Sequence, residues 1–314
     1  MSRKPLSIVF MGTPEFAVPS LTALLEGEDR VSLVVTRPDR PKGRTGKPVK
    51  SPVRIVAEGR GIPVLTPENP SDPAFVERLK ESSPDLSAVV AYGHILKKAV
   101  LEIAHLGTVN VHASLLPTYR GAAPIERSII NGETTTGVTT ILLDEGIDSG
   151  DILLMREVPI GDDETAGDLT GRLSVLGAEL LIETIGGLRE GTIRPTPQDH
   201  AKKTLAPMLS KQEGHIDWGL TPREIKNRVR GMTPRPGAYT ILGGEPVKIF
   251  SVLIVDSRAD APPGTVVRVG EGGIFVAAGG GILSVTELQA PGKKRMGAGE
   301  FLRGRRIPVG TLFQ

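Results

Sequence analysis

Short apolar runs alternate with amphipathic stretches through the first half of the 314-residue chain. Each run is almost continuously apolar, as in strands that are buried on both faces of a parallel sheet. We expect such strands at residues 6–11, 31–36, 62–65, 86–92, 107–112, 138–143 and 152–158. Residues 164–188 carry apolar side chains at helical spacing and should form a long closing helix. The pattern predicts an α/β fold that begins with a doubly wound domain.

Local sequence marks two helix starts within this domain. Thr13 precedes Pro14, and Ser51 precedes Pro52. A hydroxyl residue before a proline is typical of an N-cap followed by the first helical position. We therefore expect helices to begin directly after Thr13 and Ser51.

The sequence changes character after the long helix. Residues 190–206 contain Pro195, Pro197 and several polar side chains, which indicates a linker. One helix is then expected at 221–230, and short strands at 238–242, 246–254, 264–269, 273–278 and 282–288. Short strands between glycine-rich turns suit a small β-barrel. The predicted division is a first domain at 1–189, a linker at 190–206 and a second domain at 207–314.

An amide, an imidazole and a carboxylate are candidates for one site. Asn110 and His112 are two apart near the end of an expected strand, so their side chains should share a face at the edge where α/β sheets bind ligands. Asp148 follows the expected strand at 138–143 and could reach the imidazole if the two strands are neighbours. This set suits acyl transfer to an amine. The alternative is a turn-capping asparagine beside a histidine satisfied in the core.

Composition excludes other chemistry. The chain has no cysteine, so it has neither a disulfide framework nor a thiolate nucleophile. Its five histidines are scattered and no metal-binding motif is present, so we expect no metal. No apolar run is long enough for a signal peptide or a membrane span, which favours a cytoplasmic protein with no membrane partner.

A longer motif surrounds these residues and carries a resemblance. Asn-x-His-x-Ser-Leu-Leu-Pro-x-x-Arg-Gly-Ala-x-Pro stands at residues 110–124, and Asp-x-Gly-x-Asp-x-Gly at 144–150. The string resembles the signature of the 10-formyltetrahydrofolate-dependent formyltransferases. The resemblance implies a Rossmann-like formyltransferase domain, 10-formyltetrahydrofolate as the formyl donor, and a catalytic set of Asn110, His112 and Asp148. In that set Asn110 and His112 stabilise an oxyanion, while Asp148 favours the protonated imidazole and takes a proton from the amine.

The same resemblance implies residues that contact the folate. They lie in segments expected at the carboxyl edge of the sheet: Ala91, Tyr92, Gly93, Ile95, Leu96, Ser114, Leu115, Leu116, Pro117, Leu142 and Asp144. We expect His94, in the same segment, to be a solvent-facing loop residue. The hydroxyl of Ser114 should also cap the turn after its strand.

Stretches from both ends of the chain resemble the branch of this family that formylates methionyl-tRNA. They lie at residues 10–17, 38–41, 51–53, 121–125, 216–218 and 291–294. This likeness implies that the acceptor is the α-amino group of methionyl initiator tRNA and that the second domain is an oligonucleotide-binding (OB)-like, tRNA-binding barrel. It also suggests a monomer. Trp218 is expected in the core of that barrel.

Positive charge is clustered although the net charge is only +2. Basic side chains gather at 37–54, 223–235 and 293–306, and separated basic clusters favour a polyanionic partner over a solvated face. Candidate tRNA contacts are Arg37, Arg40, Lys42, Arg44, Lys47, Lys293, Lys294 and Arg295. One rival interpretation is a formyltransferase acting on an amino sugar nucleotide, whose smaller anion would not need several clusters. Another is a non-catalytic RNA-binding protein, which the intact Asn110, His112 and Asp148 argue against.

Overall fold

A computed structural model describes residues 4–41, 46–255 and 258–314. The chain forms two compact units, each assembled from three segments. Unit 1 comprises Met1–Gly121, Thr136–Val158 and Thr170–Ala206, and unit 2 comprises Ala122–Thr135, Pro159–Leu169 and Pro207–Gln314. Among the described residues, no helix is long and apolar enough to cross a membrane.

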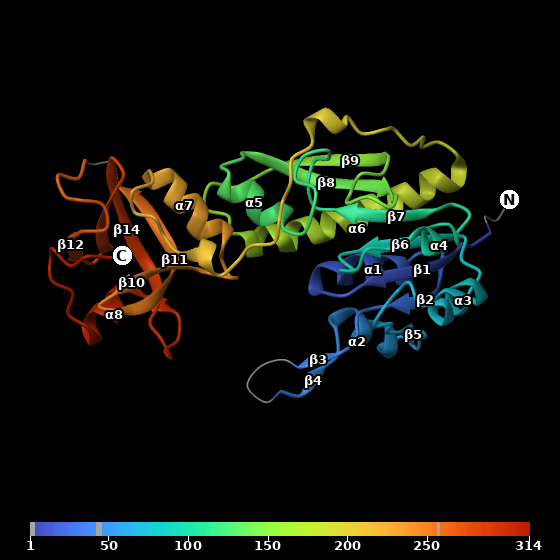
Figure 1. The fold of residues 1–314 in the computed structure, drawn as a ribbon, viewed down its shortest axis with the longest axis horizontal. Helices are drawn as coiled ribbons and strands as arrows, with labels where there is room; N and C mark the ends of the chain where they lie inside the picture. Colours follow the sequence, from blue (N-terminus) through green and yellow to red (C-terminus); the bar gives the residue numbers. More distant parts are fainter. Residues whose placement is uncertain (1–3, 42–45, 256–257) are drawn as a thin grey trace. The chain divides into compact units, whose positions relative to one another are not determined.

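Unit 1 is built on a seven-stranded sheet with the order β5-β2-β1-β6-β7-β8-β9 (Figure 1). The strands are β1 Ser7–Gly12, β2 Arg30–Val35, β5 Val64–Leu65, β6 Leu86–Val90, β7 Thr108–His112, β8 Thr135–Leu142 and β9 Ile152–Pro159. The neighbouring strands β5, β2, β1, β6 and β7 all pair in parallel. Strand β8 pairs antiparallel to β7. The strand order reverses beside β1, so unit 1 has the switch point at which α/β sheets bind ligands.

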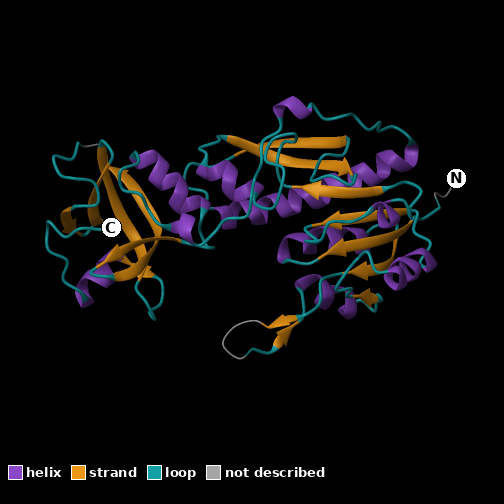
Figure 2. Ribbon diagram, viewed as in Figure 1, coloured by secondary structure: helices purple, strands orange, loops and turns teal. Residues whose placement is uncertain are grey.

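Helices surround this sheet (Figure 2). They are η1 Glu15–Ala17, α1 Val18–Glu26, α2 Pro52–Gly59, α3 Pro73–Glu81, α4 Lys98–Leu101, α6 Ala166–Glu190 and η2 His200–Lys202, and a small hairpin joins β3 Arg40–Pro41 to β4 Pro48–Val49. Val9 and Met11 of β1 share a buried cluster with α3 and α4, while Ile8 and Phe10 are buried on the opposite face. Burial on both faces explains the continuous apolar runs and confirms the doubly wound prediction.

The two predicted helix starts had different outcomes. The Ser51 hydroxyl accepts a hydrogen bond from Arg54 N at 3.1 Å, so the predicted N-cap of α2 is confirmed. The prediction at Thr13 was wrong. Pro14 itself is the extended residue before η1, and the Thr13 hydroxyl donates to Tyr92 O at 3.0 Å. Thr13 therefore joins the end of β1 to the segment after β6, and α1 begins only at Val18.

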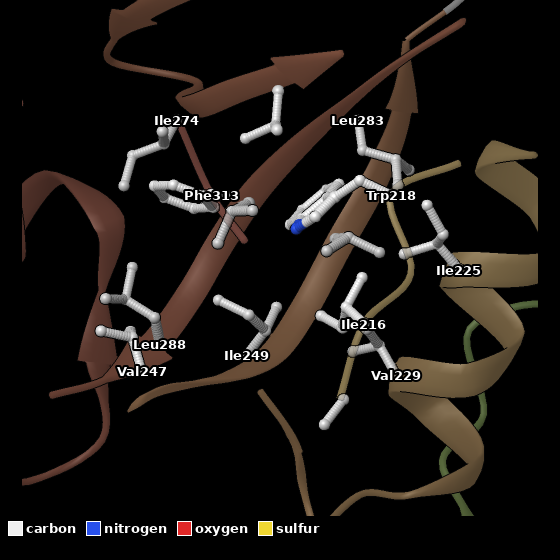
Figure 3. Packing of buried hydrophobic residues seen from close by; sticks show 14 of the residues in the cluster. Ile216, Trp218, Ile225, Val229, Val247, Ile249, Ile274, Leu283, Leu288 and Phe313 are labelled. Atoms are coloured by element: carbon white, nitrogen blue, oxygen red, sulfur yellow. The ribbon is translucent and has the colours of Figure 1, made fainter. Parts of the chain in front are cut away.

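Unit 2 contains a second sheet with the order β10-β11-β14-β13-β12, with β15 paired to β14. Its elements are α5 Pro124–Ile130, η3 Gln212–Gly214, α7 Pro222–Gly231, β10 Ala238–Leu242, β11 Glu245–Val255, β12 Val266–Gly270, β13 Gly273–Ala278, β14 Gly281–Gln289, β15 Met296–Gly297 and α8 Ala298–Gly304. Helix α7 starts with a capping box between Thr221 and Glu224. It buries Ile225 and Val229 against the sheet, in a core that includes Trp218 as expected (Figure 3).

Residues 311–314 join the two edges of this sheet. Ile241 of β10 exchanges backbone hydrogen bonds with Gln314 at 2.7 and 3.0 Å. On the other side, Val266 N donates to Thr311 O and Phe313 N to Gly264 O, both at 2.8 Å. The bonds on both sides close the strands into a ring, which leaves neither β10 nor the start of β12 as an open edge. The closed ring agrees with the predicted small barrel.

Candidate active site

Strand β7 presents Asn110 and His112 on one face, near the carboxyl edge of the parallel strands. Their register partners on β8 are Ile141 and Thr139, so β7 and β8 are neighbours, which meets the condition that the sequence left open for Asp148. Asn110 is 8% exposed and His112 is 5% exposed. The side-chain amide of Asn110 makes no hydrogen bond with any residue that the structure describes. Its two N–H donors are therefore available to a ligand.

The imidazole of His112 lies between two oxygen atoms. Its Nε2 is 2.9 Å from Tyr119 O, and because a carbonyl only accepts, Nε2 carries a proton in this bond. Its Nδ1 faces Asp148 Oδ2 at 3.6 Å. The same Asp148 oxygen accepts a hydrogen bond from Gly121 N at 2.9 Å. The structure thus brings the three predicted residues together, with the histidine and the aspartate already engaged and the asparagine amide free.

Three non-glycine residues near this edge have left-handed backbone. They are Ala91 after β6 (φ 48°), Tyr119 after β7 (φ 60°) and Asp148 after β8 (φ 47°). Such conformations persist where the surroundings hold them, and they concentrate at functional sites. At Gly150 an added Cβ would lie 1.8 Å from Leu142 O, so the loop that carries Asp148 also depends on a glycine.

Two buried residues that the sequence analysis did not assign to the site support this loop. Gln198 donates from Nε2 to Asp148 O at 2.9 Å and to Gly150 O at 2.7 Å. Arg120 donates to Gln198 Oε1. Arg120 stood in the motif without a role, and Gln198 fell within the expected linker. That segment is part of unit 1 and pairs with the start of β9, because Ile152 and Thr196 exchange backbone hydrogen bonds at 2.8 and 2.9 Å.

The segment after β6, expected to contact the folate, divides into exposed and buried positions. Ala91, Gly93 and Ile95 are exposed, while Tyr92 and Leu96 belong to the core. Burial raises the pKa of Tyr92 to about 12, because the phenolate would lose its hydration. The expectation for His94 was wrong in part, because its ring is half-buried, 5.3 Å from that of Tyr92. Burial and nearby arginines lower its pKa.

The other expected folate positions lie after β7 and β8. Ser114 is fully buried, and its hydroxyl donates to Thr118 O at 2.6 Å, which is the turn cap that the sequence predicted. Asp144 is exposed and accepts hydrogen bonds from Gly146 N and the Ser149 hydroxyl. Leu116 is buried, and three more are half-buried: Leu115, Pro117 and Leu142.

The candidate tRNA contacts differ in how free their charges are. Arg40 and Lys47 are exposed beside the β3–β4 hairpin, whereas Lys42 and Arg44 lie outside the described residues. Arg37 is half-buried over Gly93, whose Cβ, if present, would lie 3.3 Å from the guanidinium.

In unit 2 the exposed Lys293 and Lys294 make no ion pair within the described part of the chain. Arg295 is paired with Glu287, and its guanidinium lies 4.6 Å from the ring centroid of Phe250. Lys293 and Lys294 are therefore the uncommitted charges of this group.

The basic cluster at 223–235 is partly paired within unit 2. Lys226 pairs with Asp162 at 3.0 Å and with Asp163 at 2.6 Å, and Arg223 also pairs with Asp162. Arg230 is buried and donates to the carbonyl of Gly161 at 3.0 Å. These three cations are bonded within unit 2, whereas Arg235 of the same cluster is exposed, and a role of the cluster in binding nucleic acid stays a prediction.

Sequence comparison places the chain among known proteins. It matches the family described as formyl transferase over residues 6–185 and the formyl transferase C-terminal domain over residues 208–306. It is 50% identical to the methionyl-tRNA formyltransferase of Geobacter metallireducens, with 97% of each chain covered. It is 49% identical to the methionyl-tRNA formyltransferase of Desulfotalea psychrophila, with 99% of this chain and 96% of that relative covered.

Similar solved structures share the fold. An N-formyltransferase from Helicobacter canadensis, in complex with folinic acid and dTDP-3-aminofucose, gives a TM-score of 0.67 at 21% identity, covering 89% of this chain and 99% of the other. HypX from Aquifex aeolicus, in complex with tetrahydrofolic acid, gives a TM-score of 0.64 at 17% identity, covering 98% of this chain and 51% of the other.

Proposed function

Because this chain belongs to the methionyl-tRNA formyltransferase family, we propose that it transfers a formyl group from 10-formyltetrahydrofolate to the α-amino group of methionyl initiator tRNA. The observation that carries the proposal is the free amide of Asn110 beside the His112–Asp148 pair. An amine needs no protein nucleophile in this reaction. It needs a proton acceptor and donors for the oxyanion.

In the proposed reaction the neutral amine attacks the formyl carbon, and a carbon–nitrogen bond forms as the carbonyl oxygen becomes an oxyanion. Asn110 donates hydrogen bonds to that oxyanion. His112 also donates to the oxyanion, once its Nε2–H no longer donates to the Tyr119 carbonyl. Asp148 takes the proton of the amine, directly or through water. The bond from the carbon to N10 of the folate then breaks, and N10 receives a proton as the carbonyl reforms.

The exposed backbone of Ala91, Gly93 and Ile95 and the loop at Leu142 and Asp144 are the positions that we assign to the folate. Ser114, Tyr92, Leu96 and Leu116 are buried and would shape this site from beneath. We assign the tRNA to the basic residues of two regions: Arg37, Arg40, Lys42, Arg44 and Lys47, and Lys293, Lys294 and Arg295.

We also propose that the protein is a cytoplasmic monomer, since its acceptor is found in the cytoplasm. Sedimentation analysis at micromolar concentration tests the oligomeric state, and a stable dimer would contradict it. The division into domains at 1–189 and 207–314 with a linker at 190–206 likewise remains a proposal. Limited proteolysis tests it: cleavage confined to residues 190–206 would support the division, and resistance of that segment to cleavage would contradict it.

The direct test of function is transfer of labelled formyl from 10-formyltetrahydrofolate to methionyl initiator tRNA. Free methionine and an amino sugar nucleotide are offered in parallel. Formylation of the charged tRNA alone supports the proposal. Transfer to the sugar would replace it with the sugar-nucleotide alternative, and transfer to none of the acceptors would contradict both.

A further inference from the structure

A network of buried side chains forms hydrogen bonds to the loop that carries Asp148. Gln198 is 5% exposed, and its amide nitrogen donates to the carbonyls of Asp148 and Gly150, on either side of Ser149. Two bonds from one amide group fix the backbone of this loop, including the left-handed residue Asp148.

The other end of the Gln198 side chain faces Arg120, which is also 5% exposed. Arg120 Nε lies 3.1 Å and Nη2 2.5 Å from Gln198 Oε1. A guanidinium only donates, so it fixes the amide with its oxygen toward Arg120 and its NH2 group toward the loop. Arg120 makes no ion pair with a carboxylate in the described residues, and its other side-chain partner is His200 Nδ1 at 3.1 Å.

The network reaches the Asp148 carboxylate as well as its backbone. Arg120 is followed directly by Gly121, whose N–H donates to Asp148 Oδ2 at 2.9 Å. The backbone of Arg120 is itself held, since its N donates to Thr204 O at 2.9 Å and its O accepts from Ala206 N at 2.7 Å. One connected set of bonds thus determines where the carboxylate lies relative to His112.

We infer that Gln198, oriented by Arg120, is a positioning residue that holds Asp148 in place for proton transfer. The inference rests on the proposed function, in which Asp148 receives the proton of the amine. Among the described residues, Gln198 makes no hydrogen bond to His112 or to the Asp148 carboxylate, so its hydrogen bonds reach the carboxylate only through the loop. Loss of the hydrogen bonds that hold a metal ligand in place costs about 10- to 100-fold in activity, and we expect a loss of the same order here.

The substitution Gln198→Glu separates this role from simple packing. Glutamate keeps the shape and the acceptor for Arg120, and its charge gains a guanidinium partner, so the protein should still fold. It has no N–H to give to the carbonyls of Asp148 and Gly150. We expect kcat to fall about 10- to 100-fold while KM for the charged tRNA and for the formyl donor stays within about threefold. Gln212→Glu, the same change at an exposed position, is the control and should keep kcat.

Two further measurements test whether Gln198 acts through Asp148 and the loop that carries it. In an Asp148→Asn background, Gln198→Glu should lower kcat by less than about twofold, because the residue through which it acts has already been altered. Amides of the 144–150 loop should exchange with solvent about tenfold faster in the Gln198→Glu protein, and this readout needs no turnover.

Unchanged kcat together with unchanged loop exchange would overturn the inference, as would a full additional loss in the Asp148→Asn background. If Gln198→Glu does not fold, Gln198→Met is measured with the same expectations for kcat and exchange. An unaltered protein that transfers no formyl group contradicts the proposed function, and loop exchange then still decides the role of Gln198.

Discussion

At the scale of single residues, the three polar side chains of the site differ in whether they already have hydrogen-bond partners. Within the described chain the amide of Asn110 has no hydrogen-bond partner, whereas His112 and Asp148 are already bonded to the surrounding loops. A donor without a partner is costly in a buried position unless a ligand or water satisfies it. Asn110 is therefore the residue on which the oxyanion proposal depends most directly.

Asn110→Ala removes this donor. We expect kcat to fall by about 10²- to 10³-fold with little change in either KM, because the oxyanion exists only in the transition state. Steady-state kinetics with both substrates varied measure the effect, and Asn69→Ala, at an exposed turn, is the control that should retain activity. Near-normal turnover by Asn110→Ala would remove the assignment.

Tyr92 provides a prediction about stability. Its hydroxyl is buried without a hydrogen-bond partner in the described chain, and burial raises the pKa of Tyr92 to about 12. A pKa raised above the unfolded value near 10 means that stability is complete below pH ~10 and is lost as the pH rises toward 12. Tyr92→Phe should leave stability at neutral pH unchanged or slightly higher, and it should reduce the alkaline loss. Urea unfolding at pH 7 and pH 11 measures both, and equal losses in the two proteins would contradict the argument.

At the scale of elements, residues 311–314 close the barrel of unit 2. Phe313 is buried within the core, and its ring lies 5.8 Å from that of Trp218 in an edge-on arrangement (Figure 3). Phe313→Ala should cost about 3–5 kcal/mol of unfolding free energy, because a large buried ring leaves a cavity. Leu312→Ala, at an exposed neighbour, is the matched control. Denaturant titration compares the two, and similar small losses would show that this segment does not hold the ring.

A carboxyl group in unit 2 predicts an acid-sensitive contact between η3 and α5. The hydrogen bond from Arg127, followed by one from Ser210 N, lowers the pKa of Glu213 to about 2. The folded pKa is depressed, so this stabilisation is present above the unfolded value near 4.5 and is lost as the pH falls toward 2. Glu213→Gln should lower the melting temperature at pH 6.5, and this difference should shrink at pH 3. Glu77→Gln, on the surface of α3, is the control. A difference that does not change with pH would refute the assignment.

The elements themselves were largely predictable, because apolar runs report burial directly. Strands β1, β2, β6 and β7 and helix α7 were placed within one or two residues of their positions. Side-chain pairing has no such local signal. Arg120 and Gln198 are 78 residues apart, so no pattern near either could indicate their bond. Thr13 shows that a local signal can also be ambiguous. A Thr-Pro pair is compatible with an N-cap, but here the Thr13 hydroxyl donates to the distant Tyr92 O instead.

At the scale of the whole molecule, the basic clusters differ in how many of their charges are paired with acidic side chains of the chain. The sequence gives the number of cations but cannot tell which are neutralised by distant acids, as Lys226 is by Asp162, 64 residues away. Lys293 and Lys294 make no ion pair with any residue that the structure describes, so their charges are available to phosphate.

If each of these lysines contacts one phosphate, replacing both with alanine should weaken tRNA binding. It should also make the slope of log K against log salt less negative by about 2. Filter binding across a salt series measures this slope, and Arg78→Ala with Lys80→Ala on α3 is the charge-matched control. An unchanged slope would exclude these lysines from the interface.

The segment that closes the ring of unit 2 also determines when this barrel can be completed during protein synthesis. Thr240 is bonded to Gln314, 74 residues later, and β10 and β12 both precede the residues that join them. During synthesis both edges must wait, unpaired, until residues 311–314 have left the ribosome. Contacts of such long sequence separation form slowly, and we expect the barrel to be the last part of the protein to mature. For that interval the nascent chain has two open strand edges, and a chain stalled before residue 311 would expose both to other chains.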